Sequence, residues 1–140
     1  MITENDVIER VTDFLTRRNW KIVSTATTVQ HGPDVVARAG PGKEIWIEAK
    51  GQTSSKHGTR RYGKEFNRSQ KEDHLGRALL KCCQYLSEKP DLIVAIAVPN
   101  DELDLKLIRD IRPALERLKV VTFLVDEDGS VGAAPDPSAW

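Results

Sequence analysis

Apolar residues recur at every third or fourth position in three stretches of the chain, a spacing that is typical of helices with one buried face. These helices are expected over residues 3–18, 70–88 and 101–118. In the first, Thr3 is expected to be the N-cap, with Asp6 three residues later completing a near capping box. Pro113 is expected to kink the third helix, because proline lacks the backbone N–H that a helix interior uses.

Five further stretches are rich in β-branched residues or alternate apolar and charged residues, as strands do. They cover residues 20–29, 34–39, 44–50, 91–98 and 120–126. The order α-β-β-β-α-β-α-β predicts an α/β fold with a mixed central sheet flanked by helices. In this sheet the first three strands form an antiparallel meander, and the strands reached through helices pair in parallel. One domain is expected over residues 1–126, followed by a loosely ordered tail over 127–140.

The Gly-Pro-Gly turn at residues 40–42 decides which side chains share a face of this sheet. If all three residues form the loop, Asp34 faces Glu48 across the hairpin, and Lys50 follows on the same face. A two-residue loop would place Asp34 and Glu48 on opposite faces. With the three-residue loop, the other face carries a purely apolar set: Val35, Ala37, Ile45, Ile47 and Ala49.

Two carboxylates about 5 Å apart on one face repel each other unless a cation lies between them. Mg²⁺ binds one or two carboxylates and completes its shell with water and substrate phosphate. The backbone carbonyl of Ala49 could supply another oxygen ligand. The alternative is a hairpin held by ion pairs, Asp34 with Lys50 and Glu48 with Arg38.

The pattern Pro33-Asp34, a short hairpin and then Glu48-Ala49-Lys50 resembles the signature of the PD-(D/E)XK nuclease superfamily. The element order is similar to its restriction-endonuclease-like αβββαβ core, with an additional α-β unit, and the resemblance covers roughly residues 3–126. It implies that Asp34, Glu48 and the Ala49 carbonyl bind Mg²⁺, for which Mn²⁺ could substitute. It also implies that Lys50 assists phosphodiester hydrolysis, so that Asp34, Glu48 and Lys50 are the catalytic residues.

Many members of that superfamily also carry a glutamate on the first helix, and this chain has two candidates there. Glu4 falls within the apolar stripe of the helix, whereas Glu9 points away from it. Glu4 is therefore the expected additional metal ligand or support for one. Equally, it could be a first-turn acid at the positive end of the helix dipole.

Residues 51–71 carry six basic side chains and one acidic one, although the formal net charge of the whole chain is zero. Basic groups neutralise phosphates, and interleaved aromatic rings stack on bases. The expected nucleic-acid contacts are Lys56, Arg60, Arg61, Lys64, Arg68, Gln70 and Lys71. Two alternatives remain: the loop is merely solvated, and Gln70 is a surface residue at a helix N-terminus.

The sequence contains no apolar run long enough for a membrane span and no signal-peptide pattern at residues 1–10. Cys82 and Cys83 are adjacent in a predicted helix and are not expected to bond to each other, which favours a reducing, cytoplasmic setting. The chain is thus expected to be a Mg²⁺-dependent nuclease acting on DNA, without a membrane. A homodimer is expected if it cleaves duplexes, and the small size of the chain is compatible with dependence on a targeting partner protein. The alternatives are an idle module of the same fold that binds nucleic acid or a partner, and an ion-paired subunit of a larger machine.

Overall fold

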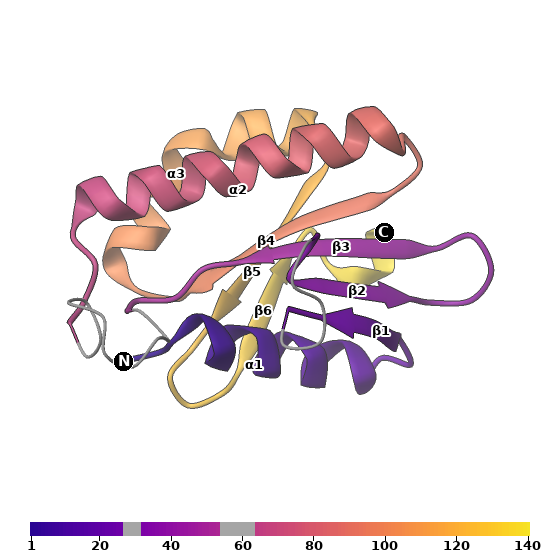
Figure 1. Cartoon of the computed structure of the whole chain (residues 1–140), viewed down its shortest axis with the longest axis horizontal. Coiled ribbons are helices and arrows are strands. Elements are labelled where there is room, and N and C mark those ends of the chain that lie inside the picture. Colours follow the sequence, from indigo (N-terminus) through magenta and orange to yellow (C-terminus); the bar gives the residue numbers. More distant parts are fainter. Residues whose placement is uncertain (27–31, 54–63) are drawn as a thin grey trace.

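In a computed structural model, which describes residues 1–26, 32–53 and 64–140, the chain forms three layers. A six-stranded mixed sheet lies between α1 on one face and α2 and α3 on the other (Figure 1). The elements are α1 (Glu4–Thr16), β1 (Lys21–Thr25), β2 (Val35–Arg38), β3 (Glu44–Ala49), α2 (Arg68–Glu88), β4 (Ile93–Pro99), α3 (Glu102–Arg117), β5 (Val120–Val125), β6 (Val131–Ala134) and the short 3₁₀ helix η1 (Pro137–Ala139). This confirms the expected α/β architecture, which is compatible with a restriction-endonuclease-like fold.

The strands lie in sequence order across the sheet. β1, β2 and β3 pair antiparallel, and β3, β4 and β5 pair in parallel, as the helical connections predict. In the β2–β3 hairpin Val36 pairs with Trp46, and Ala39 N–H donates to Lys43 O at 2.9 Å. The turn therefore contains three residues, which confirms the register that places Asp34 and Glu48 on one face.

The two faces of the sheet carry separate cores. The α1 face includes the apolar set expected from the hairpin alternation: Val35, Ala37, Ile45, Ile47 and Ala49. On the other face, α2 and α3 cover β4 and β5 through residues such as Ala78, Cys82 and Ile108. Trp46 packs against this second core, so the even-numbered residues of β3 face α2. Glu48 is thereby directed toward α2 as well.

The helix ends follow local capping. Thr3 and Asp6 form the expected capping box at α1. At α2, Asn67 accepts a hydrogen bond from Gln70 N–H at 2.9 Å, so the helix begins earlier than the apolar pattern predicts. α3 continues through Pro113 to Arg117. Within the described ranges, no helix combines the length and apolar character that crossing a bilayer requires.

The expectation of a loosely ordered tail is wrong. β6 pairs antiparallel with β5, and its Val131 and Ala133 pack against the α1-face core. The ring of Trp140 lies 5.9 Å from that of Trp20 and 5.6 Å from that of Phe123. The tail is therefore held by its pairing with β5 and by the packing of its few apolar side chains. These side chains lie among Gly, Pro and Ser, so the sequence shows no strand-like pattern there.

Candidate active site

Glu48 is the most buried acid of the site. It lies near the end of β3 with a side chain that is 1% exposed. Its Oε1 accepts a hydrogen bond from the hydroxyl of Tyr85 at 3.1 Å and lies 3.1 Å from the ammonium of Lys81, both on α2. Its Oε2 is buried and has no hydrogen-bond partner among the residues that the structure describes. One oxygen is thus engaged by α2, and the other is left without a donor.

Asp34, immediately before β2, is held against the end of β3. Its Oδ2 accepts a hydrogen bond from the backbone N–H of Ala49 at 2.8 Å. Burial raises the pKa of Asp34 to about 7, the Ala49 N–H opposes this, and the negative charges of Glu48 and Glu4 add to the increase. The structure therefore brings Asp34 and Glu48 together, and their mutual repulsion is visible in this shift.

Lys50 follows β3, and its backbone N–H donates to Ala97 O at 2.9 Å. Burial lowers the pKa of His74 on α2, and the positive charge of Lys50 lowers it further, so Lys50 and His74 are close in space. Among the described side chains, Lys50 has no ion pair within 4.0 Å. The alternative of a hairpin held by the ion pairs Asp34–Lys50 and Glu48–Arg38 is therefore wrong, because neither pair forms among the described side chains. Arg38 pairs with Glu44 at 2.6 Å instead.

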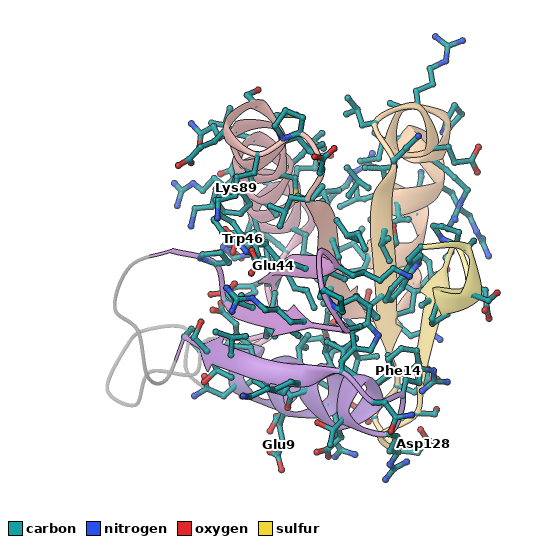
Figure 2. All side chains as sticks on the ribbon, turned by 90° about the vertical axis from the view of Figure 1, so that its right-hand side faces the viewer. Glu9, Phe14, Glu44, Trp46, Lys89 and Asp128 are labelled. Atoms are coloured by element: carbon teal, nitrogen blue, oxygen red, sulfur yellow. The ribbon has the colours of Figure 1, made fainter. Side chains whose placement is uncertain are left out.

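Glu4 lies in the first turn of α1, half-buried, and its negative charge raises the pKa of Asp34. Glu9 is exposed and points away from the sheet (Figure 2). Of the two candidates, Glu4 is therefore the one that lies near Asp34. In the described part of the chain, no three His, Cys, Asp or Glu side chains gather closely enough to form a metal cluster, so a ligand role for Glu4 stays a prediction.

The chain beyond Lys50 runs against the start of α1. Gln52 N–H donates to Ile2 O at 2.7 Å, and Ile2 N–H donates to Gln52 Oε1 at 2.8 Å. The side-chain amide of Gln52 also donates to Asp101 Oδ2 at 3.0 Å, at the N-cap of α3. Gln52 thus ties the segment that follows β3 to the starts of both α1 and α3, and it places Glu4 next to that segment.

Gly51→Ala is expected to destabilise the fold by about 1–3 kcal/mol, because overpacking against backbone atoms cannot relax easily. An added Cβ would lie 2.6 Å from the carbonyl carbon of Thr3 and would also collide with the backbone nitrogen of Glu4. Gly76→Ala on α2 is the matched control: its Cβ meets nothing within 4 Å. That change should stabilise the helix by about 0.5–1 kcal/mol. Urea unfolding measures both, and a neutral Gly51→Ala would contradict the close approach of α1.

The prediction that Lys71 contacts nucleic acid is wrong. Its side chain is 2% exposed and lies between α2 and α3. The ammonium donates to Asp101 Oδ2 at 2.7 Å and to the Asp104 carboxylate. Burial alone would lower the pKa of Lys71, but the two carboxylates outweigh burial and raise it. Lys71 is therefore a charged anchor for the N-terminus of α3, because a buried ammonium requires such partners.

The other basic residues divide into two groups. Lys56, Arg60 and Arg61 lie outside the described residues. Lys64 and Arg68 are exposed, and Arg68 pairs with Glu72 at 3.0 Å. Gln70 Oε1 accepts from Asn67 N–H at 2.8 Å, so its side chain completes the α2 capping box, in accordance with the local alternative.

The described ends of the basic segment meet beside the site. Phe66 N–H donates to Gln52 O at 2.7 Å, and the ring of Phe66 packs edge-on against His74 at 4.6 Å. Gln52 and Phe66, which flank the undescribed residues 54–63, are therefore adjacent, and Gln52 lies two residues beyond Lys50.

Trp46 shares the α2-facing side of β3 with Glu48. Its ring lies 5.0 Å from that of Tyr85, and its indole N–H donates to Glu44 Oε2 at 2.9 Å. Lys89 lies over the same ring at 4.8 Å, and Figure 2 shows Lys89, Trp46 and Glu44 together at this end of α2. Trp46 thus packs against the tyrosine whose hydroxyl donates to Glu48.

Sequence reasoning missed Lys81 and Tyr85, the two α2 residues that contact Glu48. They are four residues apart and therefore lie on one side of the helix. That side borders the apolar stripe that contains Ala78 and Cys82, and this position is the signal that could have identified them.

The site fits a hard divalent cation in the chemistry of its donors. Asp34 and Glu48 provide carboxylate oxygens, the ligands that Mg²⁺ prefers. Oε2 of Glu48 is a buried carboxylate oxygen without a partner among the described residues, and such an oxygen needs a donor or a cation. The site as described thus consists of two adjoining carboxylates, with Glu4 near them. Lys81 of α2 contacts Glu48, and Lys50 directly follows β3 and lies near His74.

Two solved structures are similar to this chain. One is an XisH family protein from Nostoc punctiforme, with 16% sequence identity over 91% of this chain and 96% of that chain, at a TM-score of 0.57. The other is an fdxN element excision controlling factor protein from Anabaena variabilis, with 17% identity over the same shares and the same TM-score. No protein-family model matches the sequence, and no curated protein matches it significantly. The comparisons therefore establish a shared fold with these two proteins.

Proposed function

We propose that the protein is a Mg²⁺-dependent nuclease that hydrolyses phosphodiester bonds of DNA. One observation carries the proposal: Ala49 N–H holds Asp34 beside Glu48, whose buried Oε2 has no partner among the described residues. Two adjoining buried carboxylates are unfavourable without a cation, and the raised pKa of Asp34 reflects that cost.

In this proposal, Asp34, Glu48 and the Ala49 carbonyl hold the ion, and Glu4 supports them from α1. When bound, Mg²⁺ would polarise a phosphate oxygen and acidify a coordinated water. Lys50 would orient the attacking water and neutralise the negative charge that develops on the phosphate. Its ammonium is available for this role, since it has no described ion-pair partner within 4.0 Å.

DNA is proposed as the substrate on two grounds. The described residues on either side of the basic segment, Gln52 and Phe66, are hydrogen-bonded to each other, and Gln52 follows Lys50 by two residues. One structural neighbour is named as a factor that controls excision of an element, which is compatible with an activity on DNA. Phosphate contacts of this kind make binding strongly salt-dependent and insensitive to sequence.

The Lys81–Glu48 ion pair favours a second candidate, an idle module that binds DNA or a partner without cleaving it. Cleavage of plasmid, linear, branched and single-stranded DNA, each with Mg²⁺, Mn²⁺ or chelator, separates the two. Under the nuclease proposal, at least one substrate is cut with metal and none is cut with chelator. DNA binding without metal-dependent cleavage of any substrate would reject the nuclease and leave the binding module.

A further inference from the structure

The ammonium of Lys81 forms an ion pair with Glu48 that has no role in the proposed hydrolysis. The side chain is 49% exposed, yet its Nζ lies 3.1 Å from Oε1 of Glu48, which is 1% exposed. Burial alone would lower the pKa of Lys81, but the hydrogen bond and charge of Glu48 raise it. A half-exposed lysine therefore reaches inward to a buried carboxylate.

Other described cations near the hairpin do not take this position. Arg38 pairs with Glu44 at 2.6 Å, and Lys89 lies 3.9 Å from the same Glu44. Tyr85 also binds Oε1 of Glu48, but it is a neutral donor. Because a buried carboxylate is costly without an opposite charge, Lys81 is the counter-ion that allows Glu48 to remain inside the metal-free protein.

We propose that Lys81 is a positioning residue of the metal site, whose ammonium is the resident counter-ion of Glu48 and is displaced when a divalent cation binds. The inference rests on the proposed function, since it concerns the same carboxylates. In the metal-free protein, Lys81 holds the Glu48 carboxylate near Asp34. Full binding of the cation requires that the Lys81–Glu48 ion pair break, so the strength of this pair sets the affinity of the site for the metal.

Because Lys81 is partly exposed, moving its ammonium from Glu48 into water costs little free energy. A lysine has a flexible stem and a strongly hydrated ammonium, so a half-exposed one returns readily to water. Oε2 of Glu48 is already without a described partner, so a cation can approach that oxygen while Lys81 still contacts the other. After displacement, the ammonium remains at the rim of the site through its attachment to α2.

Lys81→Met is the test, read by calorimetric titration of Mn²⁺ into the substrate-free protein. The variant should bind Mn²⁺ about tenfold more tightly than the wild type, which corresponds to about 1.4 kcal/mol. Without metal its melting temperature should fall by roughly 3–10 °C, because Glu48 loses its counter-ion. Lys81→Arg, which keeps the charge and the reach, should restore wild-type affinity and stability.

Arg77→Met is the matched control for long-range electrostatics. Arg77 is exposed one turn earlier on α2, and no described ion pair joins it to Glu48. Its removal should change Mn²⁺ affinity less than threefold. If Lys81→Met and Arg77→Met tighten binding equally, direct displacement is refuted.

The outcomes separate this inference from the proposed function. If the wild type binds Mn²⁺ and Lys81→Met binds it no more tightly, the inference fails and the nuclease proposal stands. If neither protein binds Mn²⁺, both fail. Should Lys81→Met not fold, Lys81→Gln takes its place in the same titration, because it keeps a donor toward Glu48 but removes the charge.

Discussion

Lys50→Ala is expected to lower metal-dependent DNA cleavage by about 10²–10⁴-fold while the fold and Mn²⁺ binding remain. The side chain has no described ion pair that the fold would lose, and its backbone bond to Ala97 O persists in the variant. Removal leaves Asp34 and Glu48 in place to hold the cation. Single-turnover cleavage rates measure the loss, and circular dichroism and Mn²⁺ titration check what remains.

Lys106→Ala is the matched control, because Lys106 is an exposed lysine on α3. It should cleave at the wild-type rate. A Lys50→Ala protein that is folded, binds Mn²⁺ and cleaves as fast as the wild type would remove Lys50 from the chemistry.

Asp34→Asn is expected to stabilise the metal-free protein at pH 8 by roughly 1–3 kcal/mol. The pKa of Asp34 is raised to about 7, whereas an unfolded aspartate has its ordinary value of 3.8. Between these values the folded state binds more protons than the unfolded state, so wild-type stability falls as pH rises through this window. Asparagine keeps an acceptor for Ala49 N–H without the charge. Urea unfolding at pH 5 and pH 8 should therefore show a steeper pH dependence for the wild type.

Asp34→Asn should also remove the stabilisation that metal gives. Millimolar Mg²⁺ or Mn²⁺ binds the folded wild type and raises its melting temperature by mass action, whereas the variant should show no increase. Asp110→Asn, which changes an exposed acid on α3, should retain the full increase. A wild type indifferent to metal and destabilised by Asp34→Asn would instead indicate that Asp34 serves a structural ion pair or hydrogen bond.

The sequence predicted the β2–β3 hairpin but left two loop lengths open, and the bond from Ala39 N–H to Lys43 O decides for the three-residue loop. Side chains alternate with a period of two, and the Gly-Pro-Gly turn permits a three-residue loop. With a three-residue loop, these two rules place Asp34 opposite Glu48 from local information alone. Glu4 was selected over Glu9 by helical periodicity, which is also a local property.

The remaining parts of the site depend on contacts between distant elements. Lys71 occurs in a basic run, and only the packing of α2 against α3 shows that Asp101 and Asp104 neutralise it. Lys81 and Tyr85 reach Glu48 because α2 packs over the end of β3 that carries Glu48. The hydrophobic pattern of the sequence does not specify where along β3 the helix packs. Local patterns identify the face on which a residue lies, whereas the partner across the interface follows from the assembled layers.

The double attachment of Gln52 has a consequence for the order of folding. Its side chain bonds Ile2, 50 residues earlier, and Asp101, 49 residues later. Contacts of such separation carry a large loop-closure entropy and are characteristic of slow folding. The hairpin with Asp34 and Glu48 can form from neighbouring segments, and the start of α1 can be fastened to it once Gln52 is present. The start of α3 can be fastened only after Asp101 has been added. A chain still emerging from the ribosome would therefore carry the two acids long before α3 could be fastened beside them.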